Sequence, residues 1–405
     1  MAVFHAFRAL RPTPEKAADV AALPYDVVNR EEAKSIGDEN PLSFLHIDRP
    51  EMDLEPETDL YDDRVYEKAK ENLDNMEEKG ILVQDQKACY YIYELVRKGK
   101  TQTGIVGCSS IDDYMNGVVK KHELTREDKE QDRIHHVDSC NANTGPIFLA
   151  CRYPDSLLTL MNNWKDHHEA AYDFTEEDQI THRVWVIDED EVISEINKEF
   201  AGIDSLYIAD GHHRAASAVK VGLKRREQNP GYTGKEEFNY FLSVVFPYDQ
   251  LCILPYNRIV KDLNGLTVKA FLGALKFNFE LMLMPGFPCR MYVDGQWYHL
   301  KAWPDIYEKK DVVGQLDVSI LQEKVLRPVL GIEDPRTDQR ISFVGGSHKA
   351  AELAEIADRT GGVAFVMYPT SMEDLMKIAD ENKLMPPKST WFEPKLRSGL
   401  FIHKL

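Results

Sequence analysis

Paired cysteines, long apolar runs and a basic excess are all missing from this sequence of 405 residues. Its six cysteines never form a C-x-x-C pair, which argues against a zinc ribbon or a redox pair and favours a reducing compartment. The most apolar runs, such as 241–246 and 363–367, have the length of a strand and are too short to span a bilayer. Because the N-terminus also lacks a signal-peptide pattern, we expect a cytoplasmic protein.

Acidic side chains outnumber basic ones by 68 to 49, which gives a net charge of −19. A surface that binds nucleic acid must displace condensed counterions, and it normally shows a basic excess. Anionic membrane surfaces attract basic segments for the same reason. We therefore expect neither nucleic acid nor a membrane among the partners of this protein.

The common nucleotide-binding signatures are absent as well. The sequence contains no G-x-x-x-x-G-K-[ST], no G-x-G-x-x-G after a strand and no H-R-D or D-F-G set. The zinc-protease pattern also fails, because Arg126 stands where a second histidine would follow His122. Gly345-Gly346-Ser347, between an expected strand and an expected helix, is a weak phosphate-loop candidate. We interpret it as a small turn with Ser347 as the helix N-cap.

The length of the chain exceeds what one ordinary core requires, and its 43% apolar and 29% charged residues are typical of globular proteins. Helical and strand-like patterns are mixed along it, which predicts an α/β (α+β) fold. We expect three regions, 1–115, 116–235 and 236–405. From Ile341 to Ala379 a strand–helix–strand–helix run predicts an α/β sheet, with a right-handed crossover if its two strands are parallel neighbours.

The clearest chemical signal is Asp210-Gly211-His212-His213-Arg214, where a short apolar run ends and a helical pattern begins. A helix that starts in this way presents unpaired backbone N–H groups and about half a positive charge, which suits an anion and phosphate in particular. Gly211 admits a ligand close to the backbone, and Arg214 can hold a phosphate through two hydrogen bonds. Asp210 is placed where it can hold Mg²⁺.

A purely structural interpretation of this motif is also available. Asp210 would then cap the helix, and the two histidines would be ordinary polar residues of its first turn. The functional interpretation is the stronger one, because cationic donors gathered at the positive end of a helix cost stability.

A second candidate is Lys121-His122-Glu123-Leu124-Thr125. A glutamate beside a histidine can act as a general base toward a hydroxyl, a role typically worth ~10²–10⁴ in rate. The alternative is a solvated segment, since residues 120–133 hold five basic and five acidic side chains. On the residues alone this alternative is slightly favoured.

Other charged residues carry weaker signals. Asp132-Arg133 and His135-His136 are interpreted as ion pairs on a helix surface. Lys388, Lys395 and Arg397 near the C-terminus could reach a phosphate, but exposed lysines at a chain end usually only improve solubility.

Taken as a set, the motifs resemble those of a bacterial and archaeal family labelled as a domain of unknown function. The resemblance covers nearly the full chain, and its Asp-Gly-His-His-Arg helix start is similar to that of the ParB–sulfiredoxin fold, which includes the free-serine kinases. It implies a ParB/sulfiredoxin-like core with large N- and C-terminal α/β additions. The residues that carry it are Pro24-Tyr25-Asp26-Val27, Lys121-His122-Glu123-x-Thr125, Asp132-Arg133, Asn143, Asp210–Arg214 and the tail from Pro387 to Leu400.

By this resemblance the protein is a kinase that phosphorylates the hydroxyl of a small metabolite, with free L-serine as the expected substrate and ATP or ADP as the donor. Glu123 would take the hydroxyl proton and His122 would orient the transferring group, while Asp210 would bind Mg²⁺. The oligomeric state stays open, with a homodimer as one option. The implied nucleotide-binding residues are Gly211, His212, His213, Arg214, Lys121 and Arg133. Unlike in the small kinases of this fold, 87 positions separate Glu123 from Asp210, so an insertion must intervene.

Two other functions stay open at this stage. One is a ParB-like switch that binds CTP or ATP without phosphorylating a metabolite. The other is a metal-dependent hydrolase that uses His122, His135, His136, His212 and His213, although their spacing matches no defined metal-ligand pattern.

Overall fold

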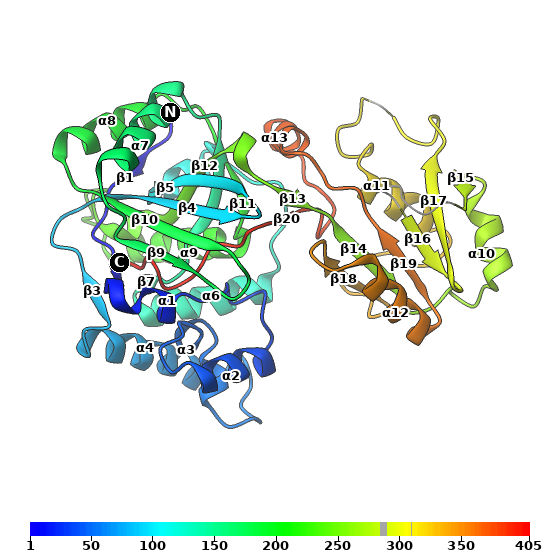
Figure 1. The fold of residues 1–405 in the computed structure, drawn as a ribbon, viewed down its shortest axis with the longest axis horizontal. Helices are drawn as coiled ribbons and strands as arrows, with labels where there is room; N and C mark the ends of the chain where they lie inside the picture. Colours follow the sequence, from blue (N-terminus) through cyan, green and yellow to red (C-terminus); the bar gives the residue numbers. More distant parts are fainter. Residues whose placement is uncertain (284–289, 309) are drawn as a thin grey trace. The chain divides into compact units, whose positions relative to one another are not determined.

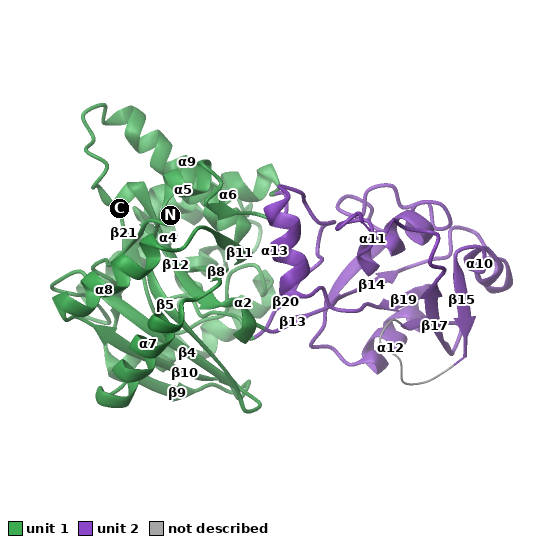
Figure 2. Ribbon diagram, turned by 90° about the horizontal axis from the view of Figure 1, so that it is seen from above, with its two compact units in different colours: residues 1–121, 125–251, 394–405 green, residues 122–124, 252–393 purple. Residues whose placement is uncertain are grey.

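The structure is a computed structural model that describes residues 1–283, 290–308 and 310–405 (Figure 1). These residues form two compact units (Figure 2): unit 1 comprises residues 1–121, 125–251 and 394–405, and unit 2 comprises residues 122–124 and 252–393. Each unit combines helices with a sheet, so the α/β (α+β) fold class is confirmed. The regions 1–115, 116–235 and 236–405 stay a prediction about independently folding domains, and their bounds differ from those of the two units.

Unit 1 is built on a nine-stranded mixed sheet. Its strands are β1 (Phe4–His5), β4 (Tyr90–Arg97), β5 (Lys100–Ser110), β6 (Val119–Lys120), β8 (Ile147–Cys151), β9 (Tyr172–Thr175), β10 (Thr181–Ile187), β11 (Leu206–Asp210) and β12 (Tyr240–Pro247). The strand order is β6-β11-β8-β12-β5-β4-β10-β9, and β1 pairs with β5 beside this path. β11 therefore lies inside the sheet, parallel to β6 and antiparallel to β8.

Helices α7 (Asp155–His167), α8 (Asp190–Ala201) and α9 (His212–Gln228) share one core with this sheet. Ala215, Ala218 and Val219 of α9 join Leu206 and Ile208 of β11 in that core. Small side chains on α9 allow the helix to approach the sheet closely. Helix α6 (Glu127–Cys140) packs along α9, where the Ser217 hydroxyl donates to the Glu130 carbonyl oxygen.

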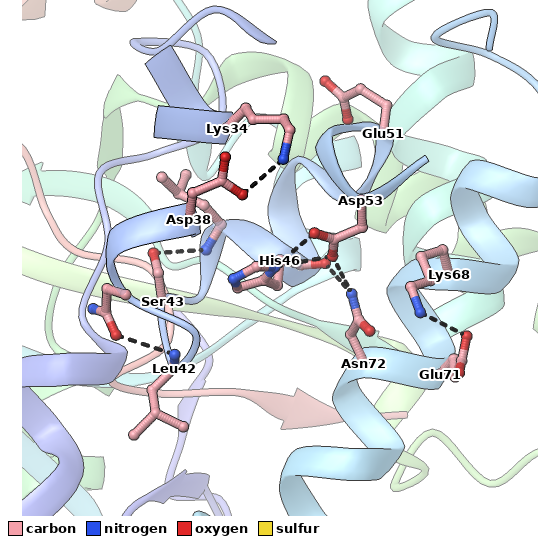
Figure 3. Close-up of polar contacts among 12 residues, drawn as sticks. Lys34, Asp38, Leu42, Ser43, His46, Glu51, Asp53, Lys68, Glu71 and Asn72 are labelled. Carbon is pink, nitrogen blue, oxygen red and sulfur yellow. Dashed lines mark hydrogen bonds and ion pairs between the residues drawn. The ribbon is translucent and has the colours of Figure 1, made fainter. Parts of the chain in front are cut away.

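A second core of unit 1 lies among the N-terminal helices α1 (Ala17–Val20), α2 (Arg30–Glu39), α3 (Leu45–Asp48) and α4 (Asp63–Glu78). His46 of α3 is held by Asp53, because its Nδ1 lies 2.9 Å from both carboxylate oxygens of that residue (Figure 3). The Asn72 amide of α4 donates to Asp53 at 2.9 Å and to the His46 carbonyl oxygen at 2.7 Å. These bonds hold α3, whose last residue is Asp48.

The end of the chain returns to unit 1 after unit 2. Ser398 exchanges two backbone hydrogen bonds with Ala22, and Ile402 exchanges two with Leu10. β21 (His403–Lys404) pairs with β7 (Ala142–Asn143), and Phe401 is fully buried. Residues 252–393 are thus inserted into the chain of unit 1, and residues 394–405, called the C-terminal tail below, complete its packing.

Unit 2 contains a six-stranded sheet with every strand antiparallel to its neighbours. Its strands are β14 (Tyr256–Val260), β15 (Phe279–Met282), β16 (Arg290–Val293), β17 (Gln296–Ala302), β18 (Ile341–Gly345) and β19 (Val363–Val366), in the order β15-β17-β16-β19-β14-β18. The expected run from Ile341 to Ala379 is present as β18, α12 (Ala350–Thr360), β19 and α13 (Met372–Asp380). Its two strands are not neighbours, because β14 lies between them.

None of the helices that the structure describes is long and apolar enough to cross a membrane. Five cysteines, Cys89, Cys108, Cys140, Cys151 and Cys252, are free thiols, and Cys289 lies outside the described residues.

Candidate functional site

The predicted strand–turn–helix at Asp210–Arg214 is present. β11 ends at Asp210, Gly211 occupies the N-cap position with φ 93°, and α9 begins at His212. A left-handed backbone favours glycine, so this residue allows the chain to turn directly from strand to helix. Within the described chain no side chain caps α9 at this end, and its first turn contains no acidic residue. The helix dipole is therefore left without a protein anion on α9 itself.

Arg214 folds back over this turn. Its Nη1 donates to the Pro146 carbonyl oxygen at 2.7 Å. A Cβ atom at Gly211 would lie 3.2 Å from Arg214 Nε and Nη2, and one at Gly145 would lie 3.2 Å from Nη1, so both glycines provide room for the guanidinium. Arg214 Nε is buried and has no hydrogen-bond partner among the described residues. A buried donor without an acceptor is costly, and an anionic ligand would satisfy it.

Asp210 is held by an ion pair that the sequence analysis did not predict. Its Oδ2 lies 2.9 Å from Lys395 Nζ of the C-terminal tail, and its Oδ1 accepts the Gly211 N–H at 3.1 Å. Burial would raise the pKa of Asp210, but the positive charges of Lys395 and Arg214 outweigh it and hold this pKa well below its ordinary value. Asp210 is therefore a carboxylate at neutral pH.

The expected Mg²⁺ ligand thus has cations as neighbours. Both oxygens of Asp210 have partners within the protein, and the partner of Oδ2 is the cationic Lys395 Nζ. Mg²⁺ favours carboxylates together with phosphate oxygens and water. With Lys395 in this position the residues do not fit a metal ion held by Asp210, and that role stays a prediction.

A small cavity beside the helix start brings other motif residues together. Its volume is about 20 Å³, room for about one water molecule, and its lining includes Tyr25, Asp48, Arg133, Thr144 and Arg214. The Arg133 guanidinium stacks on the Tyr25 ring at 4.1 Å. The Thr144 hydroxyl donates to Asp48 at 2.9 Å. Two arginines and one carboxylate thus line the cavity.

Arg133 was expected in an ion pair on a helix surface; the ion pair is confirmed, but the surface position is wrong. Its side chain is 9% exposed and pairs with Asp132 at 3.0 Å, while the Tyr66 hydroxyl donates to Asp132. Burial lowers the pKa of Arg133, but Asp132 and Tyr25 outweigh it and raise this pKa above its ordinary value. The N-terminal segments that carry Tyr25 and Tyr66 therefore cover α6, so Arg133 is a fixed buried cation.

The histidines of unit 1 have specific structural partners. His213 Nε2 accepts the Arg126 backbone N–H at 3.0 Å, which connects α9 to the start of α6. His136 Nε2 lies 2.8 Å from the Ile47 carbonyl oxygen, and burial together with Arg133 lowers the pKa of His136. His135 packs edge-on against Tyr66. These contacts leave the hydrolase hypothesis without support from His135 and His136.

The Lys121–Thr125 segment divides between the two units. Lys121 belongs to unit 1 and lies over the Tyr114 ring at 5.6 Å, whereas His122, Glu123 and Leu124 group with unit 2. There the His122 carbonyl oxygen accepts the Met385 N–H at 2.8 Å. The joint role of Glu123 with Asp210–Arg214 therefore stays a prediction.

Sequence reasoning considered two cations of the tail but did not predict that they are buried. Lys395 and Arg397, considered solubilising if exposed, are 8% and 1% exposed. One signal could have indicated them: the last residues are locally basic in a strongly acidic chain. Such a reversal of charge suggests that acidic groups elsewhere in the fold pair with the tail.

Comparison with known proteins gives a family and several distant structural similarities. No curated protein matches the sequence. A free serine kinase variant in complex with AMP is 13% identical at a TM-score of 0.37, with 76% of this chain and 92% of that chain covered. A conserved hypothetical protein from Pyrococcus furiosus is 15% identical at a TM-score of 0.36, with coverage of 76% and 96%. SbnI with a C-terminal truncation from Staphylococcus aureus is 11% identical at a TM-score of 0.38, with coverage of 73% and 86%.

The family assignment rests on a match over most of the chain. The family model described as "Protein of unknown function (DUF1015)" matches residues 4–319. This range contains both the Lys121–Thr125 segment and the Asp210–Arg214 helix start. The chain belongs to the DUF1015 family.

Proposed function

We propose that this protein is a cytoplasmic nucleotide-dependent kinase that phosphorylates the hydroxyl of a small metabolite, with free L-serine as the acceptor. The phosphates of ATP or ADP bind at the start of α9, and Gly211, His212, His213 and Arg214 provide the contacts. Arg133 and Lys121 add positive charge. The acceptor and this role of the residues come from the resemblance of the motifs to those of free-serine kinases.

One observation carries the proposal: Arg214 lies against the uncapped start of α9 with a buried Nε that has no partner among the described residues. Backbone N–H groups at a helix start and a guanidinium together make a phosphate site. Phosphoryl transfer requires positioning and charge neutralisation more than covalent catalysis. A prearranged anion site next to a cavity lined by Arg133 and Arg214 meets that requirement.

Glu123 is the proposed general base, with His122 beside it to orient the transferring group. Residues 122–124 are joined at both ends to unit 1, through Lys121 and Thr125. Thr125 is anchored there by its hydroxyl, which donates to Glu130 of α6. Arg126 is anchored through the bond from its N–H to His213.

The reaction is an in-line displacement at phosphorus. The acceptor hydroxyl oxygen forms a bond to the terminal phosphorus while the bond from that phosphorus to the bridging oxygen breaks. The hydroxyl proton passes to the Glu123 carboxylate, and the bonding electron pair leaves with the shortened nucleotide. Positive charge at the start of α9 stabilises the negative charge that develops on the phosphate oxygens.

Glu123→Gln tests this proposal. We expect turnover to fall by ~10²–10⁴, because glutamine cannot accept the proton, while nucleotide still binds. Phosphorus NMR with ATP, ADP and CTP against a panel of hydroxyl metabolites measures turnover and identifies donor and acceptor. Glu127→Gln, an exposed glutamate four positions along, is the matched control and should keep full activity.

Two outcomes would contradict the proposal. Near-normal turnover in Glu123→Gln would exclude Glu123 as the base. Tight nucleotide binding by the wild-type protein with no phosphorylated product from any acceptor would instead favour a ParB-like nucleotide switch.

A further inference from the structure

We propose that Lys395 of the C-terminal tail is a phosphate-binding residue of this site and that Asp210 positions its ammonium group. The inference rests on the proposed nucleotide-dependent activity and adds a cation to the residues assigned to the nucleotide there. It also lies outside residues 4–319, which the family model matches.

The ion pair between Lys395 and Asp210 brings a buried cation to the start of α9. The Nζ–Oδ2 distance is 2.9 Å, and the lysine side chain is only 9% exposed. Burying an ammonium group is expensive unless a carboxylate accompanies it, and Asp210 fulfils this condition. Asp210 is followed directly by Gly211, the N-cap of α9, so the ammonium lies next to the first turn of the helix.

Asp210 balances one positive charge at this place, but more than one cation lies there. The N-terminal end of a helix is positive, and a second cation, Arg214, already lies against it. Lys395 and Arg214 both act on Asp210, so a phosphate bound at the helix start would be stabilised by both side chains and by the helix dipole. Asp210 then orients Lys395 rather than a metal ion.

The tail is fixed so that Lys395 stays in this position. Arg397 is 1% exposed, and its Nη1 donates to the Lys395 carbonyl oxygen at 3.2 Å. Its Nε donates to both carboxylate oxygens of Glu176, at 2.9 and 2.8 Å, and its Nη2 donates to Asp178 at 2.5 Å. Both acids follow β9 in the connection to β10. This clamp holds the backbone of the tail two residues from the lysine.

The tail also meets Arg214. A Cβ atom at Gly145 would lie 3.1 Å from Ser398 Oγ and 3.2 Å from Arg214 Nη1, so both side chains border the same glycine. The backbone bonds between Ser398 and Ala22 fix this crossing. Lys395 and Arg214 are thus presented by two separate, anchored pieces of unit 1.

Isothermal titration of the full-length protein with ATP and ADP tests the inference. Lys395→Met should weaken nucleotide binding about tenfold or more, because a charge-assisted hydrogen bond to phosphate is lost. The nucleotide affinity of Lys395→Arg should stay within a few-fold of that of the wild-type protein, because arginine keeps the positive charge. Lys404→Met, which removes another tail lysine paired with an acid, Glu77 at 2.9 Å, should bind nucleotide like wild type.

The double variant Lys395→Met/Asp210→Asn distinguishes two roles of Lys395: binding phosphate and merely neutralising the charge of Asp210. It also replaces the single variant if Lys395→Met does not fold. We expect the double variant to bind nucleotide as weakly as Lys395→Met. Wild-type affinity in folded Lys395→Met, or its recovery in the double variant, would overturn the inference and leave the kinase proposal intact. Failure of the wild-type protein to bind either nucleotide would overturn both.

Discussion

Two junctions in this protein place glycine between a strand and a helix. In unit 1, β11 passes through Gly211 into α9. In unit 2, β18 passes through Gly346 toward α12, whose N-cap is Lys349. Both junctions were phosphate-loop candidates in the sequence, but their glycines serve different purposes.

At the first junction glycine provides a left-handed turn and room for Arg214. At the second, a Cβ atom on Gly346 would lie 2.5 Å from the Pro255 carbonyl oxygen, so this glycine allows two backbone segments to pack together. The first turn of α12 contains Glu352, which already compensates the helix dipole, whereas the first turn of α9 contains no acid. Glycine at a strand–helix junction therefore indicates an anion site only when the helix start is left positive.

Replacing each of the two glycines with alanine should give opposite results, and these are the largest effects that we expect. Gly211→Ala places a side chain at φ 93° and 3.2 Å from the Arg214 guanidinium, so it should displace Arg214 and weaken nucleotide binding by tenfold or more. Gly346→Ala should destabilise the protein by about 1–3 kcal/mol through overpacking and leave nucleotide affinity unchanged. Titration calorimetry and thermal unfolding measure the two effects. Weaker nucleotide binding in Gly346→Ala but not in Gly211→Ala would reverse the assignment.

The contrast also shows what local pattern can predict. β11, the glycine turn and α9 were predictable, because an apolar run ends in Asp-Gly and an alanine-rich helical pattern follows. The hairpin between β4 and β5 could be predicted as well, because Gly99 within Arg97–Lys100 supplies the positive φ that a tight turn needs, and Arg97 pairs with Lys100 there. In unit 2 the expectation that Ser347 caps the helix is wrong, because α12 begins later and Lys349 is its N-cap.

Contacts between distant parts of the chain could not be predicted in this way. Lys395 and Asp210 are 185 positions apart, and Arg397 and Glu176 are 221 apart. Neither pair follows a helical or strand period, so no local pattern links them. Each depends on the return of the tail to unit 1 after residues 252–393. The surroundings of the helix start therefore had to come from the structure.

Asp210 and Glu352, the acids at the two junctions, should differ in how much they make the stability of the protein depend on pH. The pKa of Asp210 would be raised by burial, but Lys395 and Arg214 outweigh this and depress it. A carboxyl with a lower pKa in the folded than in the unfolded chain stabilises the fold above its unfolded pKa, about 3.9, and this contribution is lost as the pH falls further. We expect Asp210→Asn to be less stable than wild type at pH 7, with the difference shrinking below about pH 4.

Urea unfolding between pH 7 and pH 3 measures this dependence. Glu352→Gln is the control from the second junction and should change the unfolding midpoint little, because its carboxylate forms only a half-exposed pair with His348. A destabilisation by Asp210→Asn that stays constant down to pH 3 would show that the ion pair with Lys395 contributes nothing to stability.

The smallest effect should come from His348→Ala at the second junction. His348 Nδ1 lies 2.9 Å from Glu352, but the two side chains are 54% and 49% exposed. Solvent screens such a pair, so its removal should change the free energy of unfolding by about 0.5 kcal/mol or less. Nucleotide affinity, measured by titration calorimetry, should match that of the wild-type protein. The first turn of α12 contains an acid, unlike that of α9, so we expect no phosphate to bind there. A loss of nucleotide affinity in His348→Ala would mean that the second junction binds phosphate too. An acid in the first turn of the helix would then not distinguish a junction that binds phosphate from one that does not.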